Sequence, residues 1–162
     1  MVLICLPQTR PAKPGSHSGG NLAGGNLTIQ GTSSDEFLPL PRLGELEPAC
    51  AAITQLAIHP DDDLACLATM IRHLHLIAVL FESFADGRGF SLGQIIRRDL
   101  GYLGELRARG HLIPDQYPMA LACGFDVVEI TAEQFARQPL EQWQQAWQAT
   151  PADLRTRQRQ SR

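Results

Sequence analysis

The stretch Leu76-Ile-Ala-Val-Leu-Phe81 decides the fold class of this chain. Its six consecutive apolar residues are typical of a strand buried on both faces, as in a parallel sheet that other elements cover. A loop at residues 82–89 follows, and residues 91–100 then carry apolar side chains at helical spacing. This order of strand, loop and helix predicts a βα unit.

The same alternation continues on both sides of this unit. Thr131 and Gln134 have the spacing of a capping box, and Asp61 or Asp62 would cap the first helix. We therefore predict an α/β domain with about four consecutive βα units and a small parallel sheet, either open or shaped like half of a barrel. The other strands are expected at residues 52–58, 105–109 and 125–130, and the other helices after residue 63, from residue 114 and from residue 131.

The first 35 residues differ in composition from the rest of the chain. Residues 11–34 are rich in Gly, Ser, Asn and Pro, so they cannot bury enough surface to offset their ordering entropy. We therefore predict a flexible segment at residues 1–35, a single α/β domain at residues 36–150 and a basic tail at residues 151–162. The proline-containing residues 37–41 are expected to dock on the domain as an extended arm.

The overall composition argues against several classes of protein. The 162 residues include 14 basic and 17 acidic side chains, and a net charge of −3 argues against a general nucleic-acid-binding protein. No apolar run reaches the roughly 18 residues that a membrane-spanning helix needs. The four cysteines form no C-x-x-C pair, which argues against a zinc knuckle or a dithiol redox motif and favours buried thiols in a reducing cytoplasm.

The loop after the strand at residues 76–81 carries the first candidate site. Its two glycines would allow positive φ angles and turn backbone N–H groups toward one point, while Arg88 supplies a planar bidentate donor. Ser91 would cap the following helix, whose positive end adds to the attraction. The alternative is a tight turn in which Asp86 caps the loop and Arg88 points into solvent. The candidate anion-binding residues of this loop are Asp86, Gly87, Arg88, Gly89 and Ser91.

The strand expected at residues 105–109 carries an unusual row of charges. Glu105, Arg107 and Arg109 alternate with apolar residues, so all three face one side of the sheet. Burying them unpaired would be costly. Either that side is a polar cleft, which would place Arg107 near the Arg88 loop, or the strand lies at an edge.

Cofactor and metal sites are not favoured by the spacing of the remaining motifs. Residues 87–93 read G-x-G-x-x-x-G, whose last spacing is wrong for a dinucleotide fingerprint. His73 and His75 have no carboxylate at ligand spacing, so no metal site is predicted. Cys123 is expected to be a core thiol, with a reactive thiol as the alternative. No catalytic set of side chains is evident from spacing.

Four ordered motifs within residues 59–147 resemble a small bacterial family of unknown function. They are Phe84-Ala-Asp-Gly-Arg-Gly-Phe-Ser91, residues 104–110, Asp115-Gln116 and Cys123-Gly-Phe-Asp126. Members of that family are commonly described as probable oxidoreductases involved in sulfite reduction. The resemblance implies that Asp86, Arg88, Arg107, Asp115 and Gln116 carry over as candidate site residues.

What the resemblance implies about function is mainly genomic context. Family members are usually encoded beside the haemoprotein of assimilatory sulfite reductase. We therefore expect an accessory protein of sulfite reduction that binds a small oxyanion, docks on that haemoprotein, or does both. The alternative is an oxidoreductase with a nicotinamide or flavin cofactor. His111 stands where the family usually has Asp, which puts any catalytic role of that position in doubt here.

Overall fold

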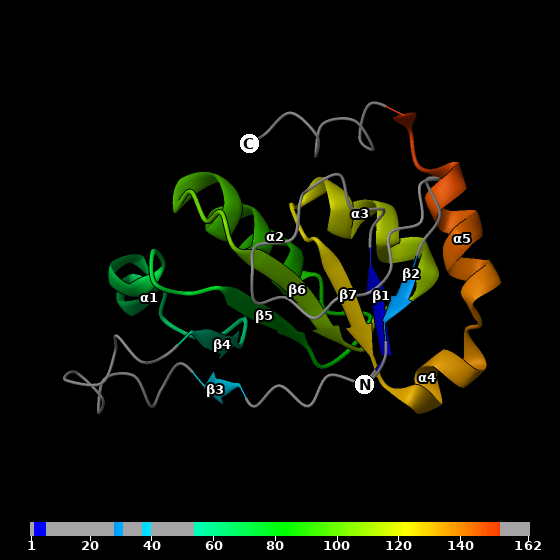
Figure 1. The fold of residues 1–162 in the computed structure, drawn as a ribbon, viewed down its shortest axis with the longest axis horizontal. Helices are drawn as coiled ribbons and strands as arrows, with labels where there is room; N and C mark the ends of the chain where they lie inside the picture. Colours follow the sequence, from blue (N-terminus) through cyan, green and yellow to red (C-terminus); the bar gives the residue numbers. More distant parts are fainter. Residues whose placement is uncertain (1, 6–27, 31–36, 40–53, 153–162) are drawn as a thin grey trace.

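Seven strands form one mixed sheet in the part of the chain that the computed structural model describes, residues 2–5, 28–30, 37–39 and 54–152 (Figure 1). Along the sheet their order is β2-β1-β7-β6-β5-β4-β3. Strands β3 to β7 are parallel, whereas β1 runs antiparallel to both of its neighbours. The strands are β1 (Val2–Cys5), β2 (Thr28–Gln30), β3 (Leu38–Pro39), β4 (Gln55–Ile58), β5 (Leu76–Phe81), β6 (Glu105–Gly110) and β7 (Val127–Ile130).

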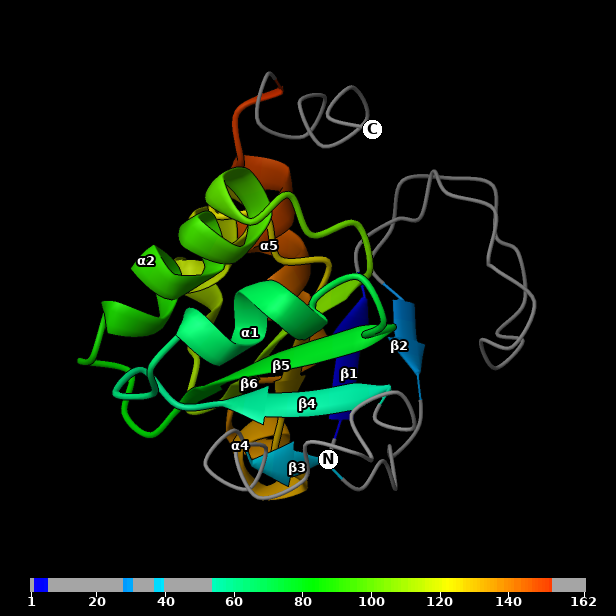
Figure 2. The same cartoon turned by 90° about the vertical axis from the view of Figure 1, so that its left-hand side faces the viewer.

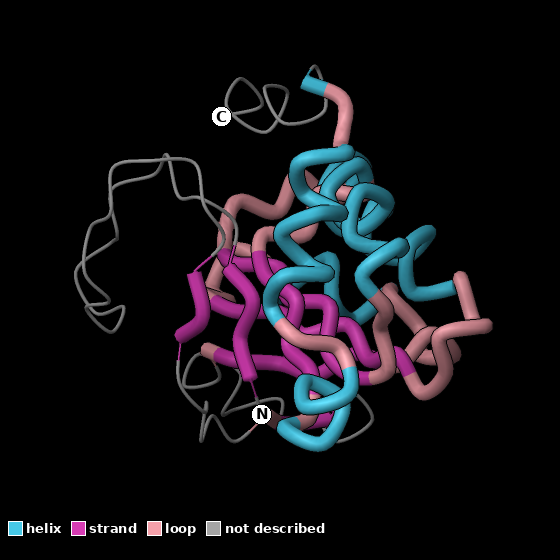
Figure 3. The backbone as a smooth tube through the Cα atoms, turned by 90° about the vertical axis from the view of Figure 1, so that its right-hand side faces the viewer, coloured by secondary structure: helices cyan, strands magenta, loops and turns pink. Residues whose placement is uncertain are grey.

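Helices follow β4, β5, β6 and β7 in turn, so the predicted βα units are confirmed. Because neighbouring parallel strands are also consecutive in the chain, right-handed crossovers place the helices after β4, β5 and β6 on the same face of the sheet. Figures 2 and 3 show this single helical layer. The sheet is open, with β2 and β3 at its edges. The helices are α1 (Ala65–Met70), α2 (Arg88–Gln94), the π-helical turn η3 (Ile95–Asp99), the 3₁₀ turn η4 (Pro114–Gln116), α3 (Tyr117–Ala122), α4 (Ala132–Arg137) and α5 (Leu140–Ala149).

Strand β5 lies at the centre of the parallel part of the sheet, and its predicted bounds are confirmed to the residue. Its side chains alternate between the helical layer and the opposite face. Phe81 belongs to the helical side, where its ring lies 4.9 Å from that of Phe90 and 6.0 Å from that of Phe125. These three buried rings fasten α2 to the sheet.

The glycines of α2 are explained by this aromatic packing. A Cβ atom at Gly89 would lie 2.6 Å from the Phe81 ring, and one at Gly93 would lie 2.5 Å from the Phe125 ring. Residues four apart lie on the same helical face, so both glycines let the helix backbone approach the sheet closely. The last two glycines of the G-x-G-x-x-x-G pattern therefore reflect helix packing.

Strands β1 and β2 were not predicted from the sequence. Val2 to Cys5 pair with β7, and Ile4 is completely buried. Local composition could not reveal this, because an added antiparallel strand depends on a partner more than 120 residues away in the chain. The other residues of the expected flexible segment 1–35 lie outside the described residues, as do residues 40–41 of the expected arm and 153–162 of the expected tail.

The starts of two helices differ from the prediction. Asp62 turns back to accept a hydrogen bond from the backbone N–H of His59 (2.7 Å), and Asp63 instead accepts from Ala65 N–H at the start of α1 (2.9 Å). Helix α2 begins at Arg88 and not at Ser91, so Ser91 lies within the helix and does not cap it. The capping box at Thr131 is confirmed on one side, because its hydroxyl accepts from Gln134 N–H at 3.1 Å.

Arg97 in η3 ties the amino edge of the sheet together, where β6 and β7 begin. Its guanidinium donates to the carbonyl oxygens of Tyr102 (2.7 Å), Gly104 (2.9 Å) and Gly124 (2.8 Å), and it pairs with Asp126. Asp126 also accepts from the backbone N–H at the start of β6. Both charged side chains are less than one fifth exposed. This cross-link explains several motif residues that sequence reasoning left without a role.

No helix in the described ranges is long and apolar enough to cross a membrane.

Candidate functional site

The candidate site lies at the carboxyl edge of the parallel sheet, which is formed by the loops that follow β4, β5 and β6. Two of these loops are joined directly, since the Gln116 side-chain amide donates to the Phe84 carbonyl oxygen at 2.7 Å. The structure therefore brings the two predicted loop groups to one edge, as expected for parallel α/β folds. The predicted residues at this edge are Asp86, Gly87, Arg88, Gly89, Ser91, Asp115 and Gln116.

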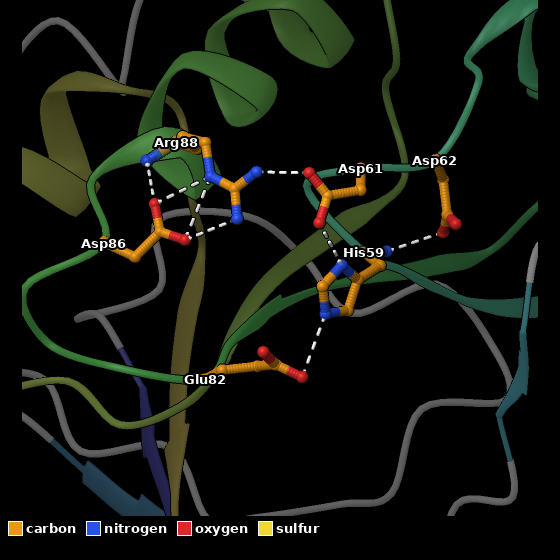
Figure 4. Close-up of polar contacts among 6 residues, drawn as sticks. All are labelled: His59, Asp61, Asp62, Glu82, Asp86 and Arg88. Atoms are coloured by element: carbon orange, nitrogen blue, oxygen red, sulfur yellow. Dashed lines mark hydrogen bonds and ion pairs between the residues drawn. The ribbon is translucent and has the colours of Figure 1, made fainter.

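Arg88 is held between two carboxylates (Figure 4). Its Nε atom lies 3.0 Å from each carboxylate oxygen of Asp86, its Nη2 lies 2.8 Å from Asp86 Oδ2, and its Nη1 pairs with Asp61. The hydrogen bond from Arg88 is the main cause that lowers the pKa of the Asp86 carboxyl, and the two aspartates raise the pKa of Arg88. The Arg88 guanidinium thus contacts two carboxylates, whereas the tight-turn alternative had it pointing into solvent without a partner.

The Asp86 loop is a capped turn. Asp86 Oδ1 accepts from the Arg88 backbone N–H at 3.0 Å, which starts helix α2. The expectation of positive φ angles here is wrong: Gly87 has φ −81°, and Gly89 lies inside the helix against Phe81. Since Gly87 is in the right-handed region, these residues do not form the predicted nest of converging N–H groups.

His59 is a central member of the site that sequence reasoning missed. It follows β4, and its Nε2 atom lies 3.0 Å from Glu82 Oε1 while its Nδ1 atom lies 3.5 Å from Asp61 Oδ2. The hydrogen bond that His59 donates to Glu82 is the main cause that raises the pKa of His59, against a smaller lowering by burial. With a carboxylate at each ring nitrogen, the imidazolium form is favoured. The signal was present, because His59 and Glu82 each directly follow a strand of one parallel sheet.

The carboxyl edge is strongly acidic. Residues 59–63, 82–88 and 111–116 contain six carboxylates and one guanidinium, a formal charge of −5 with neutral histidines, so the remainder of the chain sums to +2. A charge excess of this kind produces a negative local potential. The edge is therefore suited to cationic ligands or basic surfaces, and an anion approaching it meets net repulsion.

Arg107 belongs to a different part of the molecule. Its strand β6 lies between β5 and β7, so the interpretation as an edge strand is wrong. Arg107 is paired in register with Ala78, on the face opposite the helical layer. There its Nη1 atom lies 3.6 Å from Glu129 Oε2 and its Nε atom lies 2.5 Å from Glu105 Oε1. The structure thus does not bring Arg107 to Arg88.

The remaining charges on this face are compensated as well. Glu129 is completely buried, and its Oε1 atom lies 3.7 Å from Arg109 Nε. The ring of Phe37, next to β3, lies 4.8 Å from the Arg109 guanidinium carbon. Burial of Glu129 is tolerable because arginines lie on both sides of its carboxylate.

Metal ligation and the state of Cys123 can be assessed from the side chains of the described residues. Across the described ranges, no three His, Cys, Asp or Glu side chains are grouped so that they could hold a metal ion. Cys123 is 4% exposed, accepts a hydrogen bond from Gln94 Nε2 at 3.3 Å, and burial raises the pKa of its thiol. A raised pKa disfavours the thiolate, so the core-thiol interpretation agrees with this environment better than the reactive one. His111 is exposed, and its backbone N–H donates to Phe81.

Comparison with known proteins places most of the chain in one family. The model of a family described as "Bacterial protein of unknown function (DUF934)" matches residues 55–157. No curated protein and no solved structure gives a significant match. The matched region begins at β4 and covers strands β4 to β7 and all the helices described above.

Proposed function

Because the chain belongs to this family of bacterial proteins of unknown function, its role has to be argued from its own residues, and we propose that it is an accessory protein of assimilatory sulfite reduction that docks on the reductase haemoprotein in the cytoplasm. The link to sulfite reduction rests on the sequence resemblance at residues 59–147. The choice of docking over turnover rests on the carboxyl edge.

One observation supports docking most directly: the basic side chains of the carboxyl edge, Arg88 and His59, are already engaged by carboxylates. Arg88 is shared by Asp61 and Asp86, and both ring nitrogens of His59 face carboxylates. A general base needs a free lone pair near the reacting proton, and both ring nitrogens of His59 already lie against carboxylates. Because these side chains are cross-linked, the edge is better suited to present a surface of fixed shape than to transfer protons.

Binding of a small oxyanion remains a second part of the proposal and meets an obstacle. Arg88 could receive an anion only if Asp61 or Asp86 gave up its place on the guanidinium. The surrounding charge opposes that exchange. Docking is therefore the function that the geometry supports best.

The proposal is tested by titrating the purified 162-residue chain with the sulfite reductase haemoprotein of the same bacterium in a calorimeter. We expect saturable binding with a fixed stoichiometry. Lack of any heat or complex at tens of micromolar protein would overturn the docking function. An unrelated acidic protein of similar size serves as the control.

A thermal-shift panel with sulfite, sulfate, phosphate, NADPH and flavin separates the other candidates. A ligand at about one hundred times its dissociation constant adds about 2.7 kcal/mol to the free energy of unfolding, which moves Tm by several degrees. A shift with sulfite or sulfate would support the oxyanion site. A shift with NADPH or flavin would favour the alternative oxidoreductase over docking.

A further inference from the structure

We propose that the carboxyl edge is the docking surface itself, with Phe84 as its apolar anchor, and that it receives a basic protein face with an apolar socket for an aromatic ring. This inference rests on the proposed docking function and names the surface and the chemistry of the partner. Three features of the edge carry it.

The first feature is an exposed aromatic side chain on a fixed turn. Phe84 is 58% exposed. The turn that carries it is closed by hydrogen bonds from Asp86 N–H to the Ser83 carbonyl (3.1 Å) and from Ala85 N–H to the Ser83 hydroxyl (3.2 Å), and Gln116 holds the Phe84 carbonyl oxygen. A backbone that is already ordered loses less entropy on binding. Large aromatic side chains of this kind are common anchors of interfaces.

The second feature is an exposed apolar side chain in the first turn of α3. Met119 is 54% exposed and lies three residues after Gln116, so the two share a face of the chain where η4 continues into α3. Gln116 in turn contacts the Phe84 loop. Phe and Met are both enriched in interfaces, and the thioether of Met adapts to irregular partner surfaces.

The third feature is the charge around these two side chains. Glu82 is exposed and lies two residues before Phe84 in the chain. Asp115 is also exposed and directly precedes Gln116. The network of Asp61, Arg88 and Asp86 continues the acidic surface. The edge carries −5 in formal charge whereas the rest of the chain carries +2. Charge complementarity therefore selects a partner with Lys or Arg around the socket and disfavours polyanions.

The anchor is tested by titrating the haemoprotein with the wild-type chain, Phe84→Ser and Leu103→Ser. Leu103 is a matched control because it is 65% exposed and lies between η3 and β6, at the opposite edge of the sheet. We expect Phe84→Ser to raise the dissociation constant about tenfold or more and Leu103→Ser to leave it within about twofold. Both side chains are exposed, so both variants should keep the wild-type Tm, which is checked in parallel.

The charged rim is tested with Asp115→Lys, and Asp99→Lys in the exposed end of η3 is its control. We expect Asp115→Lys to weaken binding several-fold at low salt and to reduce its salt dependence.

If the wild type binds but neither Phe84→Ser nor Asp115→Lys weakens binding, the docking surface is overturned and the proposed function stands. If the wild type does not bind, the proposed function fails and the surface falls with it. If Phe84 instead governs a dimer of the chain alone in sedimentation, the edge is a self-interface and the basic partner is overturned.

Discussion

Arg97 at the amino edge and Arg88 at the carboxyl edge both pair with aspartates, and they differ in burial and in the partners that complete their hydrogen bonds. Arg97 is 18% exposed and donates mostly to backbone carbonyl oxygens, which belong to the two loops that precede β6 and β7. Arg88 is 55% exposed, and its guanidinium donates to the carboxylates of Asp61 and Asp86. The first arrangement holds strands together, whereas the second shapes a surface.

The residue types of an arginine–aspartate pair therefore say less about its role than the burial of the pair and its other hydrogen-bond partners do. A buried pair that satisfies backbone groups is costly to break, because removing one member leaves the others without partners. An exposed pair is screened by water and salt and adds little to stability. Both arginines lie near motifs of the sequence, and only the structure separates the structural edge from the candidate functional one.

The largest expected effect comes from Arg97→Ala. It leaves the carbonyl oxygens of Tyr102, Gly104 and Gly124 and the carboxylate of Asp126 without this donor. We expect a loss of about 2–4 kcal/mol in the free energy of unfolding, measured by urea denaturation. A loss below about 1 kcal/mol would show that the amino edge does not depend on this cross-link. Arg97→Lys keeps the charge but not the planar guanidinium, so its free energy of unfolding should lie between those of the wild type and Arg97→Ala.

Asp126→Asn should have the next largest effect. The Asp126 Oδ2 atom accepts from both Arg97 and the Leu106 backbone N–H (3.0 Å). The amide keeps one acceptor oxygen and loses the charge, so we expect a loss of about 1–3 kcal/mol by the same denaturation. The double variant with Arg97→Ala should lose less than the two single effects added together, because the residues interact. Full additivity would contradict the pairing.

The sequence predicted the parallel core of this fold well, because its signals are local. The apolar run of β5, the alternation in β6 and the Thr131 capping box each depend on near neighbours in the chain. The antiparallel strand β1 depends on β7, and no local pattern announces that pairing. Helix α2 starts at Arg88, three residues before the predicted start at Ser91, because Asp86 accepts a hydrogen bond from the Arg88 backbone N–H.

The candidate site was predicted only in part, for the same reason. Edge position could be inferred for Asp86, Arg88 and Gln116 from strand order alone. The distribution of charge could not, since it required knowing that Asp61 reaches Arg88 across 27 residues and that His59 meets Glu82. For Arg107 the sequence left open a cleft near Arg88 or an edge strand, because a strand's row of charges does not reveal which face the helices cover.

Arg88→Ala sharpens the comparison from the other edge. Because its pair is exposed and screened, we expect Tm to fall by only a fraction of the fall in Arg97→Ala, at most a few degrees. The loss should shrink further in 0.5 M salt, whereas that of Arg97→Ala should change little. Equal losses of Tm in the two variants would remove the distinction between the edges.

The smallest expected effect is a pH dependence that begins at His59. Its pKa in the folded chain is raised above 6.5, mainly by the Glu82 hydrogen bond, so the stabilisation is fully present below pH 6.5 and is lost as pH rises through the folded pKa. Glu82→Gln should lower the His59 pKa toward its ordinary value, as an NMR titration of the imidazole would show. It should also flatten the fall in Tm between about pH 6 and pH 8. An unchanged His59 pKa in Glu82→Gln would mean that Asp61 and Asp62 hold the imidazolium without Glu82, and the link between the β4 and β5 loops would then rest on Arg88 alone.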